Sequence, residues 1–295
     1  MERAEAVDFD VAYTLVGELA QRRLNEHGLR VLFIKGQVLA KQGLRPPKTS
    51  LDIDLLVHPN DFDRVRDVLG ADGWYRKDAA ELRVAHEKHS DTLLHSYWPN
   101  MIDLHRFWPG FLAERGHIFD LLWEEKERGF IQSTPVHTTG AEVSALMLAL
   151  HDIRSSGIPN REERLDALAA RCEAKWGAEA GAVLHSKASL LSAVHTAAPF
   201  LQRLGVKPEQ VTPSPELKEW QMQLRQQGRS VEGWWWRFKE APLRAKMDVF
   251  LDASALRPGQ LRALRPETPP GVLAFWKAWF TRLVEAVKWI RARKK

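Results

Sequence analysis

Residues 51–57 read LDIDLLV, a short run in which acidic and apolar side chains alternate before the run becomes wholly apolar. Successive side chains of a strand point to opposite faces, so Asp52 and Asp54 share one face and Ile53 lies on the other. The residues that we expect to be buried in this strand are Leu51, Ile53, Leu55 and Val57. Two carboxylates on one face of an apolar strand are costly unless a cation neutralises them. Oxygen ligands favour Mg²⁺ or Mn²⁺ over zinc.

The same short motif also fits a plainer structure, in which one Asp caps a helix and the other is solvated at a strand end. A third acidic residue makes the metal site the better interpretation. Within Met101–His105, Asp103 and His105 share one face of a second predicted strand, and apolar residues alternate with them. If the two strands are neighbours, Asp103 joins the first two carboxylates, and three carboxylates suit a site for two metal ions. We expect His105 to support the site through hydrogen bonds.

Upstream, Arg30–Ile34 is β-branched and aromatic, which predicts a buried strand, and Lys35-Gly36 follows it directly. A glycine lets the backbone approach a ligand closely, and a helix that begins here offers free N–H groups to a phosphate. The phosphate-binding pattern GxxxxGK[ST] is absent around this turn, so a P-loop has no support.

Working outward, the N-terminal part alternates helices and strands and closes with a hairpin, whereas the part after residue 140 is helical. The predicted helices are 7–27, 37–42, 61–69, 142–151, 161–175, 178–197 and 272–292, and the predicted strands are 30–34, 51–57, 82–85, 91–98 and 101–107. The fold class is therefore α+β, with a small mixed β-sheet, flanking helices and a mostly α-helical second domain. We place a catalytic domain at residues 1–138 and a helical domain at 139–295.

The composition excludes several classes of protein. The 295 residues include 44% hydrophobic and 27% charged side chains, as in a globular protein and unlike a disordered or collagen-like chain. A single Cys rules out an internal disulfide and a multi-cysteine zinc site, which favours a cytoplasmic location. No apolar run approaches the ~20 residues of a membrane span. A net charge of +5 permits an anionic partner without requiring one.

The order of these motifs resembles the uncharacterised bacterial nucleotidyltransferase-like family of the polymerase-β-type nucleotidyltransferase superfamily. The resemblance rests on Phe33-Ile34-Lys35-Gly36, then Asp52-Ile53-Asp54, then a helix before Gly73-Trp74-Tyr75, then Ile102-Asp103-Leu104-His105. It covers residues 11–108 best and continues more weakly through 144–154 and 256–283. The family implies a small sheet with helices on one face and a metal site on two strands.

Carried over to this sequence, the resemblance implies that Asp52, Asp54 and Asp103 are catalytic and hold the metal ions, Mg²⁺ or Mn²⁺. Asp103 would also activate the attacking hydroxyl. Lys35, Gly36 and Gln37 would occupy the turn that holds the triphosphate, where relatives have a Gly-Ser pair and this chain has Gln37 in place of the Ser. Relatives often carry an Arg shortly before the acidic strand, a place that Lys48 or Arg45 would take here.

The implied activity is transfer of NMP from an NTP, most simply ATP, to a hydroxyl or similar group of a small molecule, a peptide or a protein. One alternative is a nucleotide-sensing or partner-binding protein that has lost transfer, which the missing Ser favours. Another is an RNA-directed transferase, suggested by the basic charge and the clustered Trp residues, although nucleic acid is not the favoured partner.

Other features have plainer interpretations. A zinc site at His86, His89 and His95 lacks a convincing arrangement of ligands. His151, near a helix end, either faces the cleft as a supporting residue or complements the helix dipole. Cys172 has no activating neighbour. Residues 234–236, three consecutive Trp, either contact an acceptor or pack in the core. The last helix, 272–292, has an apolar stripe that would dock on the helical domain or lie on an anionic membrane.

Overall fold

The computed structural model describes residues 8–76, 88–131, 134–155, 160–208, 211–226, 235, 238–239, 241–254, 261 and 269–292. The chain forms two compact units. The first comprises Met1–Lys77 and His89–Arg225, and the second comprises Asp78–Lys88 and Gln226–Lys295. All residues of the predicted nucleotidyl-transfer site belong to the first unit.

A seven-stranded mixed sheet forms the centre of the first unit, in the order β3-β4-β5-β2-β1-β7-β6. The strands are β1 (Val31–Ile34), β2 (Asp52–Val57), β3 (Tyr75–Arg76), β4 (Ser90–Leu94), β5 (Met101–His105), β6 (Glu127–Ile131) and β7 (Thr134–Thr138). The pairs β2–β5 and β1–β7 are parallel, and the other neighbouring pairs are antiparallel. The predicted mixed sheet is thus confirmed.

Helices α1 (Phe9–Glu26) and α3 (Phe62–Ala71) pack on one face of this sheet. They bury Val16, Leu24 and Val65 against strand residues such as Ile53 and Leu55, which belong to the same hydrophobic cluster. Because strand side chains alternate, the burial of Ile53 on this face directs its neighbours Asp52 and Asp54 to the opposite one. Packing of α1 and α3 therefore decides where the carboxylates point.

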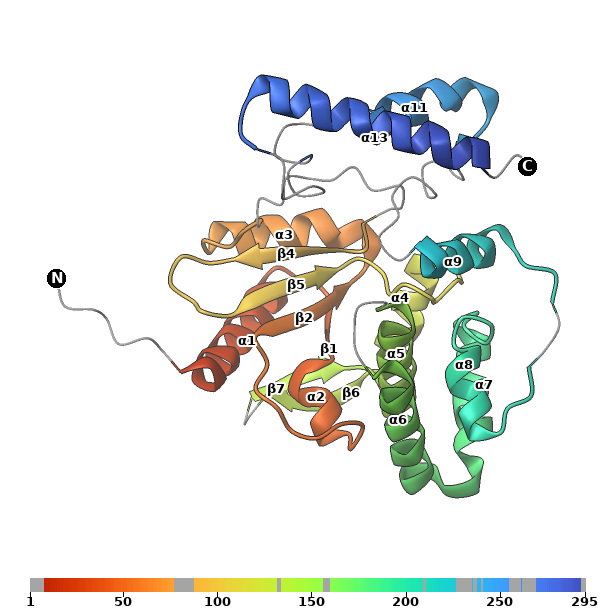
Figure 1. Ribbon diagram of the computed structural model, residues 1–295. Coiled ribbons are helices and arrows are strands. Elements are labelled where there is room, and N and C mark those ends of the chain that lie inside the picture. Colours follow the sequence, from red (N-terminus) through yellow and green to blue (C-terminus); the bar gives the residue numbers. More distant parts are fainter. Residues whose placement is uncertain are drawn as a thin grey trace. The chain divides into compact units, whose positions relative to one another are not determined.

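A second hydrophobic cluster lies on the carboxylate face, where Leu32, Ile34 and Leu56 of the sheet pack with the helices that follow it. Those helices are α4 (Arg115–Glu124), α5 (Ala141–Arg154), α6 (Arg161–Trp176), α7 (Ala180–Leu190), α8 (Ala198–Leu201) and α9 (Pro215–Gln226). Helices α5 and α6 lie side by side (Figure 1). The short helix α2 (Gly36–Lys41) follows β1, and 3-10 turns occur at Pro59–Asp61, Gly177–Glu179 and Gln202–Leu204.

Several predicted elements differ from the observed ones. Leu51 precedes the strand and is 53% exposed, so its predicted burial was wrong. The predicted helix 178–197 ends at Leu190, because Ser192 adopts a positive φ of 51° that interrupts the helix. Strands β6 and β7 and helix α4 were not predicted. The predicted strand at 82–85 lies outside the described residues.

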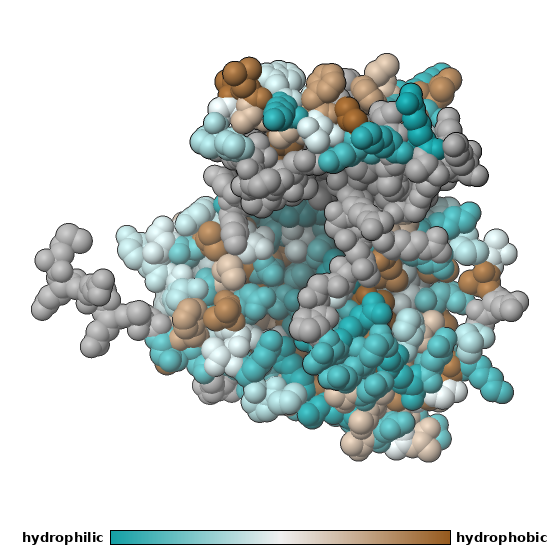
Figure 2. Space-filling model, in the orientation of Figure 1, coloured by the Kyte–Doolittle hydropathy of each residue, from teal (hydrophilic) through white to brown (hydrophobic). Residues whose placement is uncertain are grey.

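The second unit contains α11 (Lys246–Ser254), α13 (Val272–Ala292) and a 3-10 turn at Leu243–Ala245. Helix α13 matches the predicted last helix and exposes the apolar residues Val272, Leu273, Trp276, Phe280 and Val284. Figure 2 shows apolar side chains among hydrophilic ones on this unit. None of the described helices is long and apolar enough to cross a membrane. That α13 docks on the helical domain or lies on an anionic membrane stays a prediction.

The predicted domain boundary at residue 138 falls between β7 and α5. Both elements belong to the first compact unit, and the hydrophobic cluster on the carboxylate face includes residues from either side of this point. The division into a catalytic domain at 1–138 and a helical domain at 139–295 stays a prediction.

Candidate active site

Parallel pairing of β2 with β5 brings the predicted carboxylates together. In the register of these strands, Asp54 lies opposite Asp103 and Asp52 lies opposite Met101. Asp54 is 3% exposed, whereas Asp52 and Asp103 are partly buried. His105, two residues after Asp103, is directed to the same face of the sheet. Two adjacent strands thus present three carboxylates and an imidazole from one face.

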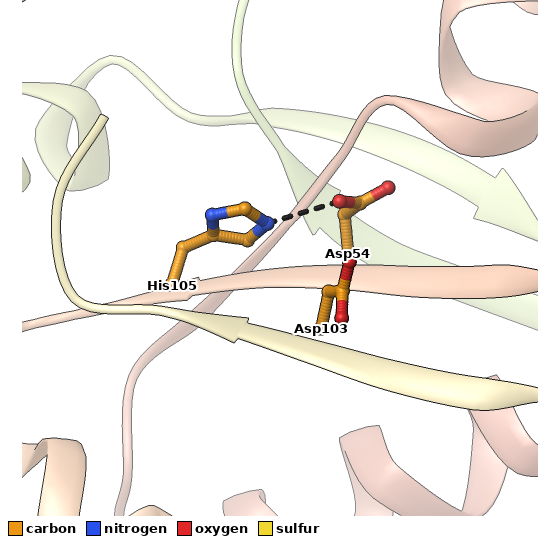
Figure 3. Close-up of side chains that lie close together, drawn as sticks. All are labelled: Asp54, Asp103 and His105. Carbon is orange, nitrogen blue, oxygen red and sulfur yellow. Dashed lines mark hydrogen bonds and ion pairs between the residues drawn. The ribbon is translucent and has the colours of Figure 1, made fainter. Parts of the chain in front are cut away.

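Asp54, Asp103 and His105 form a close cluster, in which one ligand atom from each lies within 4.8 Å of the other two. Figure 3 shows the imidazole of His105 pointing toward the carboxylate of Asp54, and the Nε2–Oδ1 distance is 3.0 Å. Thr92 of β4 donates its hydroxyl hydrogen to Oδ1 of Asp103 over 2.6 Å. These hydrogen bonds fix the orientation of both carboxylates and leave Asp103 its other oxygen.

Lys35 stands at the end of β1 and brings its ammonium group into this cluster. Its backbone has a positive φ of 58°, which is uncommon for a residue with a side chain, and it precedes the first turn of α2. Its Nζ forms an ion pair with Oδ1 of Asp54 and lies 5.4 Å from the centroid of the Trp108 ring. The buried carboxylate of Asp54 is therefore compensated by a cation from the chain itself.

Position 36 of the site leaves no room for a side chain and is occupied by Gly36. It has a φ of 50°, and a Cβ at this position would lie 2.2 Å from the hydroxyl oxygen of Tyr13. Tyr13 is 2% exposed, and its hydroxyl group interacts with the backbone N–H of Gln37. Arg45 donates from Nη2 to the carbonyl oxygen of Gly36 over 2.7 Å. The turn is thus held from both sides by side chains of a neighbouring helix and loop.

Burial dominates the electrostatics of the cluster. Burial raises the pKa of Asp54, and the nearby charges of Lys35, Arg45 and Lys48 act against this rise. Burial also raises the pKa of Asp103, whose ionised form the Thr92 hydroxyl stabilises. The pKa of His105 falls to about 3, since burial and the charge of Lys35 both disfavour a protonated imidazole. At neutral pH, His105 is therefore a neutral hydrogen-bonding group.

The donor set fits a hard divalent cation. The described residues provide no hydrogen-bond donor to the side chain of Asp52, which shares a face with Asp54. Nδ1 of His105 is buried and has no hydrogen-bond partner within the described chain. Carboxylate oxygens are the ligands that Mg²⁺ and Mn²⁺ prefer, and an imidazole is compatible with Mn²⁺. The arrangement can hold a divalent cation between two strands, beside the turn that begins helix α2.

The other predicted site residues lie around this centre. Lys48 is exposed in the loop before β2, within electrostatic range of Asp54 and Asp152. His151 lies on α5 and is partly buried, and its pKa falls to about 3 because of burial and the charges of Lys35 and Arg154. Helix α5 therefore places His151 within electrostatic range of Lys35 and His105, although no hydrogen bond joins the described side chains to it.

The structure describes only some residues of the weaker motifs. His95 is 3.2 Å from the carbonyl oxygen of Asp72, and His86 lies outside the described residues. Cys172 is buried, and burial raises the pKa of its thiol to about 12, as expected for an inert residue. Of the three consecutive Trp, Trp235 stacks against Phe238, and the two flanking ones lie outside the described residues.

Sequence comparison identifies the class of protein. The sequence profile of a family described as uncharacterised nucleotidyltransferase matches residues 6–158, so this chain belongs to that family. The match spans the strands that carry Asp52, Asp54 and Asp103 and extends to the end of α5. The resemblance predicted from the motifs is thereby confirmed. Curated proteins yield no match to the sequence.

Several solved structures resemble this chain at low sequence identity. The antibiotic-resistance factor ANT(2'')-Ia is 12% identical, with a TM-score of 0.44 over 63% of this chain and 96% of its own. Its complex with adenylyl-2''-tobramycin has a TM-score of 0.41 at 12% identity, over 61% of this chain and 98% of that one. An antigenic nucleotidyltransferase-like protein from Paracoccidioides brasiliensis has a TM-score of 0.37 at 12% identity, over 66% and 93%.

Sequence reasoning did not identify Thr92 and Arg154 as neighbours of the site. Thr92 lies opposite Asp103 in the antiparallel pairing of β4 with β5, which requires the register of a hairpin that the sequence leaves open. Arg154 follows His151 by three residues on α5, so both lie on one helix face. That spacing was a usable signal.

Proposed function

We propose that this protein is a metal-dependent nucleotidyltransferase that moves NMP from an NTP to a hydroxyl or similar group, with pyrophosphate as the leaving group. The acceptor would be a small molecule, a peptide or a protein, and ATP is the first NTP to test. The observation that carries the proposal is the register of β2 with β5, which sets Asp54 opposite Asp103 on the face that also bears Asp52 and His105. Membership of the nucleotidyltransferase family supports the same reaction class.

In this proposal Asp52, Asp54 and Asp103 hold Mg²⁺ or Mn²⁺. When bound, the cation would neutralise phosphate charge and polarise the reacting phosphoryl oxygen. Lys35 lies at the same carboxylate and would serve as a second positive group for the phosphates once a metal ion competes for Asp54. The backbone at Gly36 and Gln37 begins helix α2 and would approach the phosphates, and Lys48 would add charge from the loop.

Asp103 is the residue that we assign to the acceptor. Its Oδ1 is held by Thr92, so Oδ2 would accept the proton of the attacking hydroxyl. Because burial raises the pKa of this carboxyl, its ionised form is a better proton acceptor than an exposed aspartate. His105 would stay neutral and orient Asp54 through its Nε2–H. The chain thus supplies positioning, charge neutralisation and one proton acceptor.

Transfer can be tested before the acceptor is known. The protein would be incubated with each α-³²P-labelled NTP, Mg²⁺ or Mn²⁺, and an extract of the host cell, and labelled products would be separated. We expect a labelled product with wild type and none with Asp54→Asn or Asp103→Asn. Asp63→Asn is the matched control, because Asp63 is an exposed carboxylate on α3, which packs on the opposite face of the sheet. Equal labelling by wild type and Asp103→Asn would refute the proposal.

One observation favours a second candidate, a nucleotide-binding protein without transfer activity. Gln37 takes the place of the phosphate-binding Ser of relatives, and its backbone N–H is engaged by Tyr13. That protein would show metal-dependent binding of an NTP by calorimetry and no labelled product with any extract. The two measurements together separate the candidates.

A further inference from the structure

Arg154 is the last residue of α5 and lies beside the imidazoles of the site. Its Nη1 lies 3.2 Å from Nε2 and 3.4 Å from Nδ1 of His89. The ring centroid of His89 is 5.7 Å from that of His105, which in turn is hydrogen-bonded to Asp54. A chain of direct contacts therefore leads from the guanidinium to the carboxylate cluster.

Arg154 has no carboxylate partner among the residues that the structure describes. Arg164, by contrast, binds both oxygens of Asp152 at 3.1 and 2.6 Å. Arg154 is nevertheless partly buried, and burial lowers the pKa of its guanidinium. Burying a charge without a counter-ion is costly, which indicates that an anion from outside the chain completes this position.

The groups around Arg154 add no negative charge of their own. Burial and nearby positive charges lower the pKa of His89 to about 2, and the pKa of His151 to about 3. Arg154 and Lys35 both contribute to these two shifts, so both cations act on the same region of the site. A neutral imidazole can donate a hydrogen bond to an anion through its N–H group. Because it carries no charge, it does not repel the neighbouring cations, Arg154 and Lys35, that would attract the anion.

We propose that Arg154 is a phosphate-binding residue, which receives a phosphate group of the nucleotide across the site from Lys35. The inference rests on the proposed function, because it takes the nucleotide as the source of the anion. A planar guanidinium fork suits the oxygens of a phosphate and binds them in pairs. The contact with the ring of His89 holds the guanidinium in place before the nucleotide arrives.

Calorimetric titration of the full chain with three probes tests this assignment: ATP with Mg²⁺, inorganic triphosphate with Mg²⁺, and adenosine. Arg154→Gln should weaken ATP and triphosphate by about ten- to hundredfold, the loss expected for a charge-assisted hydrogen-bonded pair. Arg154→Lys should recover part of the affinity. Adenosine should bind equally to all variants, since it has no phosphate. Arg22→Gln, which removes the same charge from an exposed position on α1, should leave all three titrations unchanged.

Each other outcome has a distinct meaning. If Arg154→Gln binds ATP and triphosphate as tightly as wild type, the assignment of Arg154 is wrong and the proposed function is untouched. Equal weakening of all three probes would show a structural role for Arg154 and would also overturn it. If wild type and Arg22→Gln bind neither ATP nor triphosphate at any metal concentration, the proposed function itself fails, and the inference fails with it.

Discussion

The ion pair between Lys35 and Asp54 is the most consequential contact at the scale of single residues. Both side chains are buried or nearly so, with 15% and 2% of their side-chain area exposed. A buried carboxylate that loses its cation is strongly destabilising, whereas a metal ion can provide the same compensation. The site therefore has two possible cations for one carboxylate, one from the chain and one from solution.

Lys35→Met separates these two sources of charge. Without metal, we expect the free energy of unfolding to fall by about 3 kcal/mol, because Asp54 is left buried without its partner. Mn²⁺ should restore part of this loss and should stabilise the variant more than it stabilises wild type. The measurement is urea unfolding in EDTA and in Mn²⁺.

A surface pair provides the control for this comparison. Lys187 pairs with Glu125, whose side chain is 42% exposed, and Lys187→Met should cost below about 1 kcal/mol with no dependence on metal. If Mn²⁺ stabilises Lys35→Met no more than wild type, then Asp54 does not bind the cation.

At the scale of elements, the turn between β1 and α2 and the register of β2 with β5 build the site. The alternation in residues 51–57 predicted β2 and the shared face of Asp52 and Asp54, because the strand period of two is visible in sequence. Strands β6 and β7 were missed, since β6 reads ERGFI with little apolar alternation and β7 contains Pro135. In the structure β7 pairs in parallel with β1, and β6 pairs with β7.

The turn itself can be tested with a pair of substitutions. Gly36→Ala should destabilise the protein by about 1–3 kcal/mol, because a Cβ meets the Tyr13 hydroxyl and the positive φ disfavours alanine. Tyr13→Phe removes that oxygen, so the double variant should cost less than the sum of the single ones. Urea unfolding of the four proteins gives the coupling energy. A strictly additive double variant would show that the Tyr13 hydroxyl does not restrict residue 36.

At the scale of the whole molecule, His89 and His151, which are partly buried, should make stability depend on pH. The pKa of His89 falls to about 2 and that of His151 to about 3, below the ordinary value of 6.5. Below pH 6.5 these two histidines are protonated in the unfolded chain and remain neutral in the folded chain. Their contribution to the free energy of unfolding is therefore fully present above pH 6.5 and is lost as the pH falls. Each histidine contributes a slope of about 1.4 kcal/mol per pH unit.

His151→Asn should therefore reduce the slope of the free energy of unfolding against pH below pH 6.5 by about 1.4 kcal/mol per pH unit, which corresponds to one proton. The free energy of unfolding would be measured by urea titration between pH 4 and 8 in EDTA, with the exposed residue His27 changed to Asn as the control. An unchanged slope in His151→Asn would show that His151 takes up its proton in the folded protein as readily as in the unfolded chain.

The residues of the site differ in how far the sequence alone could predict them. The three carboxylates and Lys35 carry local signals, namely strand alternation and a Gly turn, and each of these lies in the first unit. Thr92 reaches the site through the register of a hairpin, which no local pattern specifies. Arg45 was a candidate only through the resemblance, and the signal for Arg154 was its helical spacing from His151. The family match extends to residue 158 and so includes helix α5, whose last turn carries His151 and Arg154.

The central claim is that the carboxylates of β2 and β5 hold the divalent cation with which an NTP binds. Electron paramagnetic resonance of Mn²⁺, titrated with the protein in the presence of ATP, measures this directly. The account predicts saturable binding of Mn²⁺ by wild type and by Asp63→Asn, and loss of that binding in an Asp54→Asn/Asp103→Asn double variant that circular dichroism shows to be folded. Mn²⁺ binding of equal affinity in the double variant would contradict the account.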